Sequence, residues 1–215
     1  MAAVAAATVL SGCGTHPGAA VVVGDATITT DQVDAAALTL CSANRSGGQA
    51  TGELSSRAAR QAAVQFLIDS ELSHQFGEDR GVEADQGEVS ATVAENAAGI
   101  EALPEDQRED FRELLVGFRE SELILTEIGQ ASLQKQGNHQ PAPEEASSEG
   151  ARLRMEWAAA VDVEVDPRFG TYAEGALAPT SGSLSVPVSD SAKAGSAADP
   201  GESWVADLPA SQKCA

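Results

Sequence analysis

The sequence has few lysines, few aromatic residues and few histidines, and these shortages limit what the protein can do. Only 3 of its 13 basic residues are lysine, and 33 acidic residues bring the formal net charge to -20. This charge repels nucleic-acid phosphates, and no basic cluster with interleaved aromatic residues offsets it, so we expect no nucleic-acid binding. The charge also discourages adsorption to anionic lipid, so membrane attachment would need a covalent anchor.

Sequence motifs of catalysis and metal binding are missing as well. We find no nucleophile elbow, phosphate-binding glycine loop or HExxH, and His16, His74 and His139 are scattered. Ser73 and His74 are an adjacent nucleophile and base, but neighbours on a helix point about 100° apart, which disfavours a hydrogen bond between them. We therefore predict that the protein is not an enzyme and has no catalytic residue, cofactor or metal site.

The N-terminal residues indicate an export signal. Residues 1–12 are small or apolar, and Cys13 follows in the tetrapeptide Leu10-Ser11-Gly12-Cys13. This segment resembles the lipobox of bacterial lipoproteins, which implies that Cys13 carries a diacylglycerol and becomes the mature, acylated (palmitate-bearing) N-terminus. We expect residues 1–12 to be a signal peptide, truncated at its start because no basic residue precedes Arg45, and 13–18 to be a linker. The alternative is an alanine-rich helix in which Cys13 is a buried thiol.

The three cysteines form an odd set until Cys13 is assigned to lipid. Cys41 and Cys214 then remain as a pair in an oxidising compartment, where a disulfide is the natural inference. Such a disulfide would close most of the mature chain into one loop, a link worth about 4–5 kcal/mol in the loop-entropy model. Two unrelated free thiols are the alternative.

The pattern of apolar residues predicts a mainly α fold. A strand at about 20–28, broken by a Gly24-Asp25 turn, comes first, and a second strand at about 161–166 comes late. Between them, helical spacing predicts a bundle of four to five helices. Two isolated strands need partners, so we expect a small sheet that pairs the early strand with the late one. Alanine supplies much of the apolar content, which suits closely packed helices.

The same pattern predicts where the core and the irregular part lie. We expect the apolar faces of the second and fourth helices, which carry Phe66 and Phe118, to form the core. Residues 171–215 are mostly Gly, Ser, Pro, Ala and Asp, which predicts an irregular tail held by the disulfide near Cys214. Trp204, Val205 and Leu208 are its candidates for docking.

Two segments give the chain a family resemblance. VVVGDATIT near the N-terminus and DVEVDPRFG before Thr171 are similar to the first and last strands of the N-terminal domain of SurA-like and PrsA-like extracytoplasmic chaperones. The resemblance covers residues 19–170, and the terminal segment looks like that of actinobacterial lipoproteins with this domain. Related chaperones often carry a parvulin prolyl isomerase domain. These 215 residues leave no room for one, so isomerase activity is not expected.

The sequence leaves more than one function open. The first hypothesis is a non-catalytic, chaperone-like lipoprotein on the outer face of the cell membrane that binds unfolded or secreted polypeptides. The second is a structural or adaptor lipoprotein that docks one envelope protein. A third, a degenerate solute-binding protein or isomerase, would need a deep pocket with converging polar groups. The residues that contact a polypeptide cannot be named from the sequence.

Overall fold

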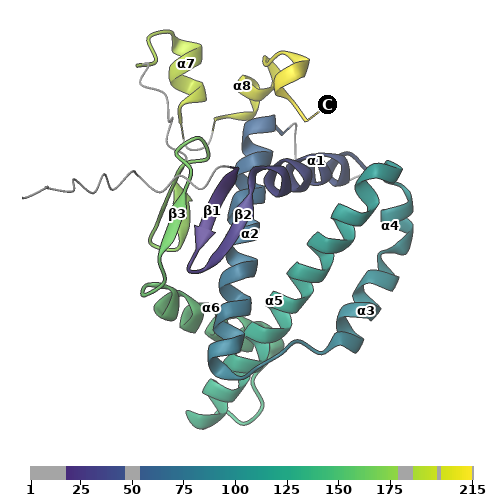
Figure 1. The fold of residues 1–215 in the computed structure, drawn as a ribbon, viewed down its shortest axis with the longest axis vertical. Coiled ribbons are helices and arrows are strands. Elements are labelled where there is room, and N and C mark those ends of the chain that lie inside the picture. The colour runs from purple at the N-terminus through teal and green to yellow at the C-terminus, as the bar shows by residue number, and fades with distance from the viewer. Residues whose placement is uncertain (1–17, 47–53, 179–185, 198–199, 215) are drawn as a thin grey trace, which may run out of the picture.

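The computed structural model describes residues 18–46, 54–178, 186–197 and 200–214, and it is mainly helical (Figure 1). The frame consists of two long helices, α2 (Ser56–Arg80) and α5 (Arg108–Lys135). The other elements are β1 (Ala19–Val23), β2 (Ala26–Thr29), α1 (Thr30–Ser46), α3 (Gln86–Glu95), α4 (Ala97–Glu101), η1 (Glu105–Gln107), α6 (Pro143–Ala158), β3 (Val163–Val165), β4 (Thr171–Ala173), β5 (Ala176–Ala178), α7 (Asp190–Gly195), α8 (Glu202–Ala206) and η2 (Ala210–Gln212). The predicted fold class is confirmed.

The larger sheet joins the two ends of the helical body. Its strand order is β2-β1-β3 and both pairs are antiparallel, with Val21 opposite Val165 and Val23 opposite Val163. Gly24 makes the turn after β1 with a φ of +58°, a backbone conformation that glycine adopts without strain. Val21 and Val23 are at most 1% exposed because β1 packs against α1 and α2. The early strand therefore pairs with the late strand, as predicted.

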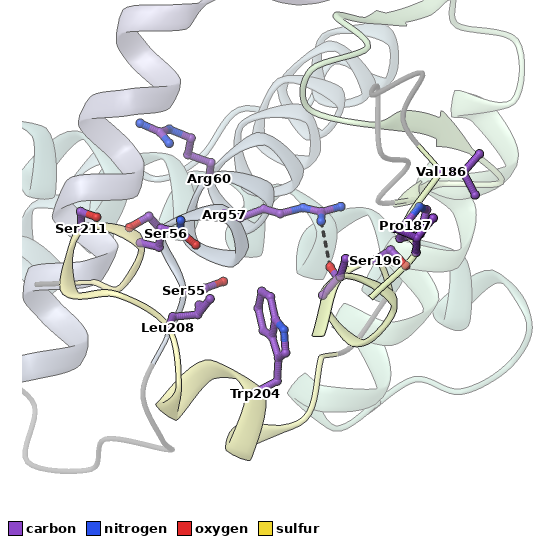
Figure 2. Close-up of a pocket in the computed structure, with 14 residues that line it drawn as sticks. Ser55, Ser56, Arg57, Arg60, Val186, Pro187, Ser196, Trp204, Leu208 and Ser211 are labelled. Atoms are coloured by element: carbon purple, nitrogen blue, oxygen red, sulfur yellow. Dashed lines mark hydrogen bonds between the residues drawn. The ribbon is translucent and has the colours of Figure 1, made fainter. Parts of the chain in front are cut away.

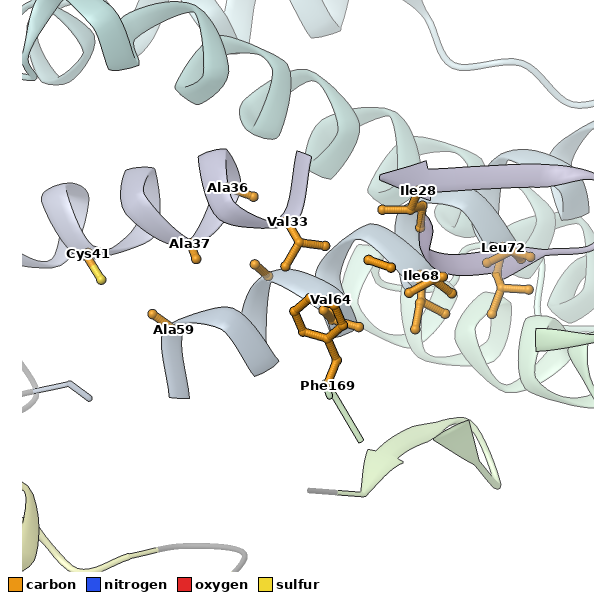
Figure 3. Packing of buried hydrophobic residues seen from close by; sticks show 14 residues of the cluster. Ile28, Val33, Ala36, Ala37, Cys41, Ala59, Val64, Ile68, Leu72 and Phe169 are labelled. Atoms are coloured by element: carbon orange, nitrogen blue, oxygen red, sulfur yellow. The ribbon is translucent and has the colours of Figure 1, made fainter. Parts of the chain in front are cut away.

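The main core lies where α1 crosses α2, and most of its side chains are small (Figure 3). No member is more than 7% exposed, and Phe169, from the loop after β3, packs beside Val64. Short side chains let the two helix backbones approach closely, as the alanine-rich composition predicted. The members on these two helices are Val33, Ala36, Ala37, Cys41, Ala59, Ala63, Val64, Ile68 and Leu72.

Helices α5 and α6 form an antiparallel pair whose backbones touch. A β-carbon on Gly129 would overlap the carbonyl oxygen of Ala146, and one on Gly150 would overlap that of Leu125. Only glycine permits this approach at either position. A second core cluster borders the contact and anchors the second half of α5; its buried members are Phe76, Ile124, Leu125 and Ile128.

The segment after residue 170 contains more regular structure than the sequence predicted. Strands β4 and β5 form a hairpin whose two turn residues, Glu174 and Gly175, have φ of +52° and +82°. The Leu177 N–H donates a 2.7 Å hydrogen bond to Oε1 of Gln65, which fastens the hairpin to α2. Helices α7 and α8 and the turn η2 follow, and α8 lies near the start of α2 (Figure 1).

Candidate polypeptide-binding surfaces

The first half of α5 carries an apolar face that the rest of the body covers incompletely. Of the described residues 108–123, none is fully buried, and the side chain of Phe118 is 56% exposed. Its apolar neighbours along this face are half-buried. We call this set the α5 strip: Phe111, Leu114, Leu115 and Phe118.

The prediction that Phe66 and Phe118 form the core is wrong for Phe118, and Phe66 is only half-buried. The reason lies in the contact between α2 and α5, where Ser70 and the edge of the Phe66 ring face Gly117 and not Phe118. A β-carbon on Gly117 would lie 3.0 Å from Oγ of Ser70, and the Ser121 hydroxyl donates to the Gly117 carbonyl at 2.7 Å. The helices therefore meet beside Gly117, and the described residues place no other element over Phe118.

Polar contacts connect α5 to α3 on one side and to α2 on the other. Arg119 donates hydrogen bonds to Glu122 on its own helix, at 2.8 Å, and to Glu88 on α3. The bond to Glu122 is the main cause that raises the pKa of Arg119 above its ordinary value. On the α2 side, Nε2 of His74 lies 3.2 Å from Oε2 of Glu120. The carboxylates of Glu88 and Glu122 therefore lie at Arg119, the residue that follows Phe118 in the chain.

A concave site lies at the N-terminal end of α2, where the C-terminal segment folds against this helix (Figure 2). The cavity has a volume of about 630 Å³. One side comes from the start of α2 and the other from residues of the C-terminal segment, with Trp204 between them in Figure 2. The lining residues are Ser55, Ser56, Arg57, Arg60, Val186, Pro187, Val188, Ala192, Gly195, Ser196, Trp204, Leu208, Ser211 and Gln212.

A disulfide joins Cys41 on α1 to Cys214 at the end of the C-terminal segment, with 5.1 Å between their α-carbons. The Cys214 N–H donates to the Leu54 carbonyl at 2.9 Å, and Lys213 forms a β-bridge with Ser55. These contacts hold one wall of the cavity against α2. Cys13, the predicted lipid site, and residues 1–17 as a whole lie outside the described residues.

Ser73 and His74 do not form a nucleophile and base pair. Ser73 is fully buried, and its hydroxyl donates to the Asp69 carbonyl at 2.7 Å and accepts from Nη1 of Arg154 at 3.1 Å. Nη2 of Arg154 also lies 2.9 Å from Oδ1 of Asp69, so this group ties α6 to α2. His74 faces Glu120 on α5 instead. Both residues have structural contacts.

The described part of the chain offers neither a metal site nor a membrane span. No group of three or more His, Cys, Asp or Glu side chains in it is arranged to hold a metal ion. None of the helices there combines the length and the apolar character that crossing a bilayer requires.

Comparison with known proteins gives one match. A family model described as the SurA-like N-terminal domain matches residues 1–115, which is more than half of the chain. The chain belongs to this family. Neither the curated proteins nor the solved structures contain a match. The SurA-like N-terminal domain family is chaperone-like, and its domains are extracytoplasmic.

The sequence named candidates for docking of the C-terminal segment but predicted no cavity. Trp204 and Leu208 were expected to dock, and both line the cavity. The contribution of Arg57 and Arg60 was not foreseen. The sequence did contain a signal that the start of α2 is unusually basic. The first turn of α2 has no acidic residue, whereas acidic side chains are favoured at that end of a helix.

Proposed function

We propose that this protein is a lipid-anchored, extracytoplasmic, chaperone-like protein that binds unfolded or exported polypeptides without catalysing a reaction. The observation that carries the proposal is the exposure of Phe118 within the α5 strip. Membership of the SurA-like N-terminal domain family supports it independently. Residues 19–170 would be the binding domain, and residues 171–215 would be a segment that the disulfide holds to it.

The α5 strip suits a partner that is unfolded and basic. Apolar burial has no directional requirement, so a strip of Phe and Leu side chains can accept many different sequences. The formal net charge of -20 favours segments that carry Lys or Arg. Such attraction between exposed charges weakens as salt is added. We therefore expect affinity for apolar, basic segments that falls with ionic strength.

The membrane attachment in this proposal depends on Cys13. Each acyl methylene that enters the bilayer contributes about 0.8 kcal/mol, so two or three acyl chains would hold the domain at the outer face of the cell membrane. The test is the intact mass of membrane-extracted protein, with Cys13→Ala as the control. A native protein that carries no acyl mass would contradict the anchoring.

Polypeptide binding can be tested by light scattering of a heat-unfolded client protein. At several-fold molar excess, the native protein is expected to delay aggregation. Phe118→Ser should weaken this effect by about fivefold, since burying about half of a phenylalanine side chain contributes about 1 kcal/mol. Met155→Ser on α6 is the matched control, because Met155 is 55% exposed but lies outside the strip. If the native protein does not delay aggregation, or if both variants behave alike, the α5 strip does not bind clients.

The alternative is an adaptor that docks one dedicated envelope protein. The same exposed strip would serve this role, because apolar burial also drives stable complexes. A pull-down of the native protein from solubilised membranes distinguishes the two functions. One partner recovered in a stoichiometric amount, and lost with Phe118→Ser, would favour the adaptor.

A further inference from the structure

The cavity beside the start of α2 has an electrostatic character unlike that of the whole protein. None of its fourteen lining residues is acidic, and two are arginine, although the chain has 33 acidic and 13 basic residues. A site that repels anions less than its surroundings do, and offers guanidinium groups, favours an anionic ligand.

Arg57 is the cation best placed to hold such a ligand. Nη1 of Arg57 donates to the Gly195 carbonyl at 3.0 Å, which directs the side chain across the cavity in Figure 2. Among the described residues it has no carboxylate partner. Arg60 differs, because its Nε lies 2.7 Å from Oδ1 of Asp34. Arg57 therefore keeps N–H donors that a carboxylate can accept from in pairs.

The rest of the lining is divided into an apolar and a polar side. The indole N–H of Trp204 donates to the Ser191 carbonyl at 2.8 Å, and its ring lies against Gly195, so the position of the ring is fixed. Val186 and Val188, which are 81% and 83% exposed, extend the apolar side. Serine and glutamine side chains supply the polar side: Ser55, Ser56, Ser196, Ser211 and Gln212.

This division selects among anionic ligands. The hydroxyls of Ser56 and Ser196 already donate to the Lys213 and Lys193 carbonyls, but an acyl chain is apolar on all sides and would make no hydrogen bond with Ser211 or Gln212. A peptide offers apolar side chains together with backbone groups that hydrogen-bond to hydroxyls. At about 630 Å³, the cavity has the size of a small-ligand site, which suits the end of a chain better than a long segment passing through. A chain end also supplies a carboxylate.

We propose that this cavity binds the carboxyl-terminal end of a polypeptide with apolar last residues, whose α-carboxylate accepts hydrogen bonds from Arg57. The apolar side chains pack on Trp204, Val186 and Val188. The site is separate from the α5 strip and goes beyond the function proposed above. The disulfide between Cys41 and Cys214 holds one wall of the cavity in place, so binding requires the oxidised protein.

The test uses two fluorescent peptides, Gly-Ser-Ala-Val-Leu with a free carboxylate and the same peptide as an amide, and measures fluorescence anisotropy. The native, oxidised protein should bind the acid at least about tenfold more tightly than the amide, because a bidentate charged hydrogen bond is lost on amidation. Arg57→Gln should bind both peptides equally, and Arg57→Lys should restore part of the preference. Arg112→Gln, an exposed arginine on α5, is the matched control.

Three outcomes would overturn the proposal. The first is equal binding of acid and amide by the native protein, and the second is an unchanged preference in Arg57→Gln. The third is that decanoate displaces the fluorescent peptide at lower concentrations than the unlabelled acid peptide does. This result would assign the cavity to an acyl ligand. Val188→Ser tests the apolar side without altering any core contact. Phe118→Ser should leave peptide binding intact, so failure here and failure of the α5 strip can be told apart.

Discussion

Reduction of the Cys41–Cys214 disulfide should separate the C-terminal segment from α1 and α2 while the helical body stays folded. Apart from the disulfide, few polar contacts near this end fasten the segment. Among the described residues they include the β-bridge between Ser55 and Lys213, the Cys214 N–H on the Leu54 carbonyl, the Ser56 hydroxyl on the Lys213 carbonyl, and Nη1 of Arg57 on the Gly195 carbonyl. Each such bond adds only about 1 kcal/mol net, which cannot offset the freedom that the segment regains.

The size of the effect follows from the length of the closed loop. The linked cysteines are 173 residues apart, and the loop-entropy model gives about 5 kcal/mol for a link of this length. For a protein of this size, about 1 kcal/mol shifts the melting temperature by about 2–4 °C, so reduction should lower it by about 10–20 °C. The shift is smaller if the segment detaches before the body unfolds, since detachment already relieves the constraint.

Two assays measure this outcome. Far-UV circular dichroism at 20 °C, roughly the temperature of maximum stability, should barely change on reduction, while the thermal midpoint falls. Limited trypsin digestion should cut faster after Lys193, which lies in the released segment and is 61% exposed. The double variant Cys41→Ser, Cys214→Ser is the control and should not respond to reductant. Identical midpoints and digestion rates with and without reductant would show that the disulfide does not hold the segment in place.

Two further predictions concern packing and charge in the helical body. Gly129→Ala should cost about 3 kcal/mol or more in denaturant unfolding, because the new methyl group would overlap the Ala146 carbonyl. Gly99→Ala, where nothing lies within 4 Å, should stabilise by about 0.5–1 kcal/mol instead. Hydrogen bonds from Arg152 lower the pKa of Glu149 from its ordinary 4.5 to about 2. Ionised Glu149 therefore stabilises the fold fully above about pH 4.5, and this stabilisation is lost as the pH falls towards 2. In Glu149→Gln, the midpoint of denaturant unfolding should lack this dependence on pH.

The sequence predicted best those elements that have a local chemical signature. Asp85 is of a residue type that is favoured at helix N-caps, and its carboxylate accepts from the Gly87 and Glu88 N–H groups at the start of α3. The alternation of valines before Pro167 predicted the late strand. Such features depend on neighbouring residues alone, so they can be identified without knowledge of the rest of the fold.

Features set by contacts between distant segments were not predictable in the same way. Phe118 has the helical spacing of a core residue, yet it is exposed because α2 and α5 meet through Gly117 and Ser70. The β4–β5 hairpin turns at Glu174-Gly175, which is a weaker turn signal than Asn-Gly, and its strands have only three residues each. The hairpin is stabilised by distant contacts, because Leu177 bonds to Gln65, 112 residues away, and Tyr172 and Leu177 pack against the main core.

The limits of the family match bear on where the domain ends. The match stops at residue 115, in the first half of α5, yet the described fold depends on later elements. Without β3, strand β1 would lose a hydrogen-bonded neighbour along Val21 to Val23, and without α6 the backbone contact at Gly129 would be open to water. Phe169, which fills the core beside Val64, also lies beyond the match. A domain needs a covered hydrophobic core and paired strands to be stable on its own. We therefore infer that residues up to 170 belong to the same folding unit as the matched region.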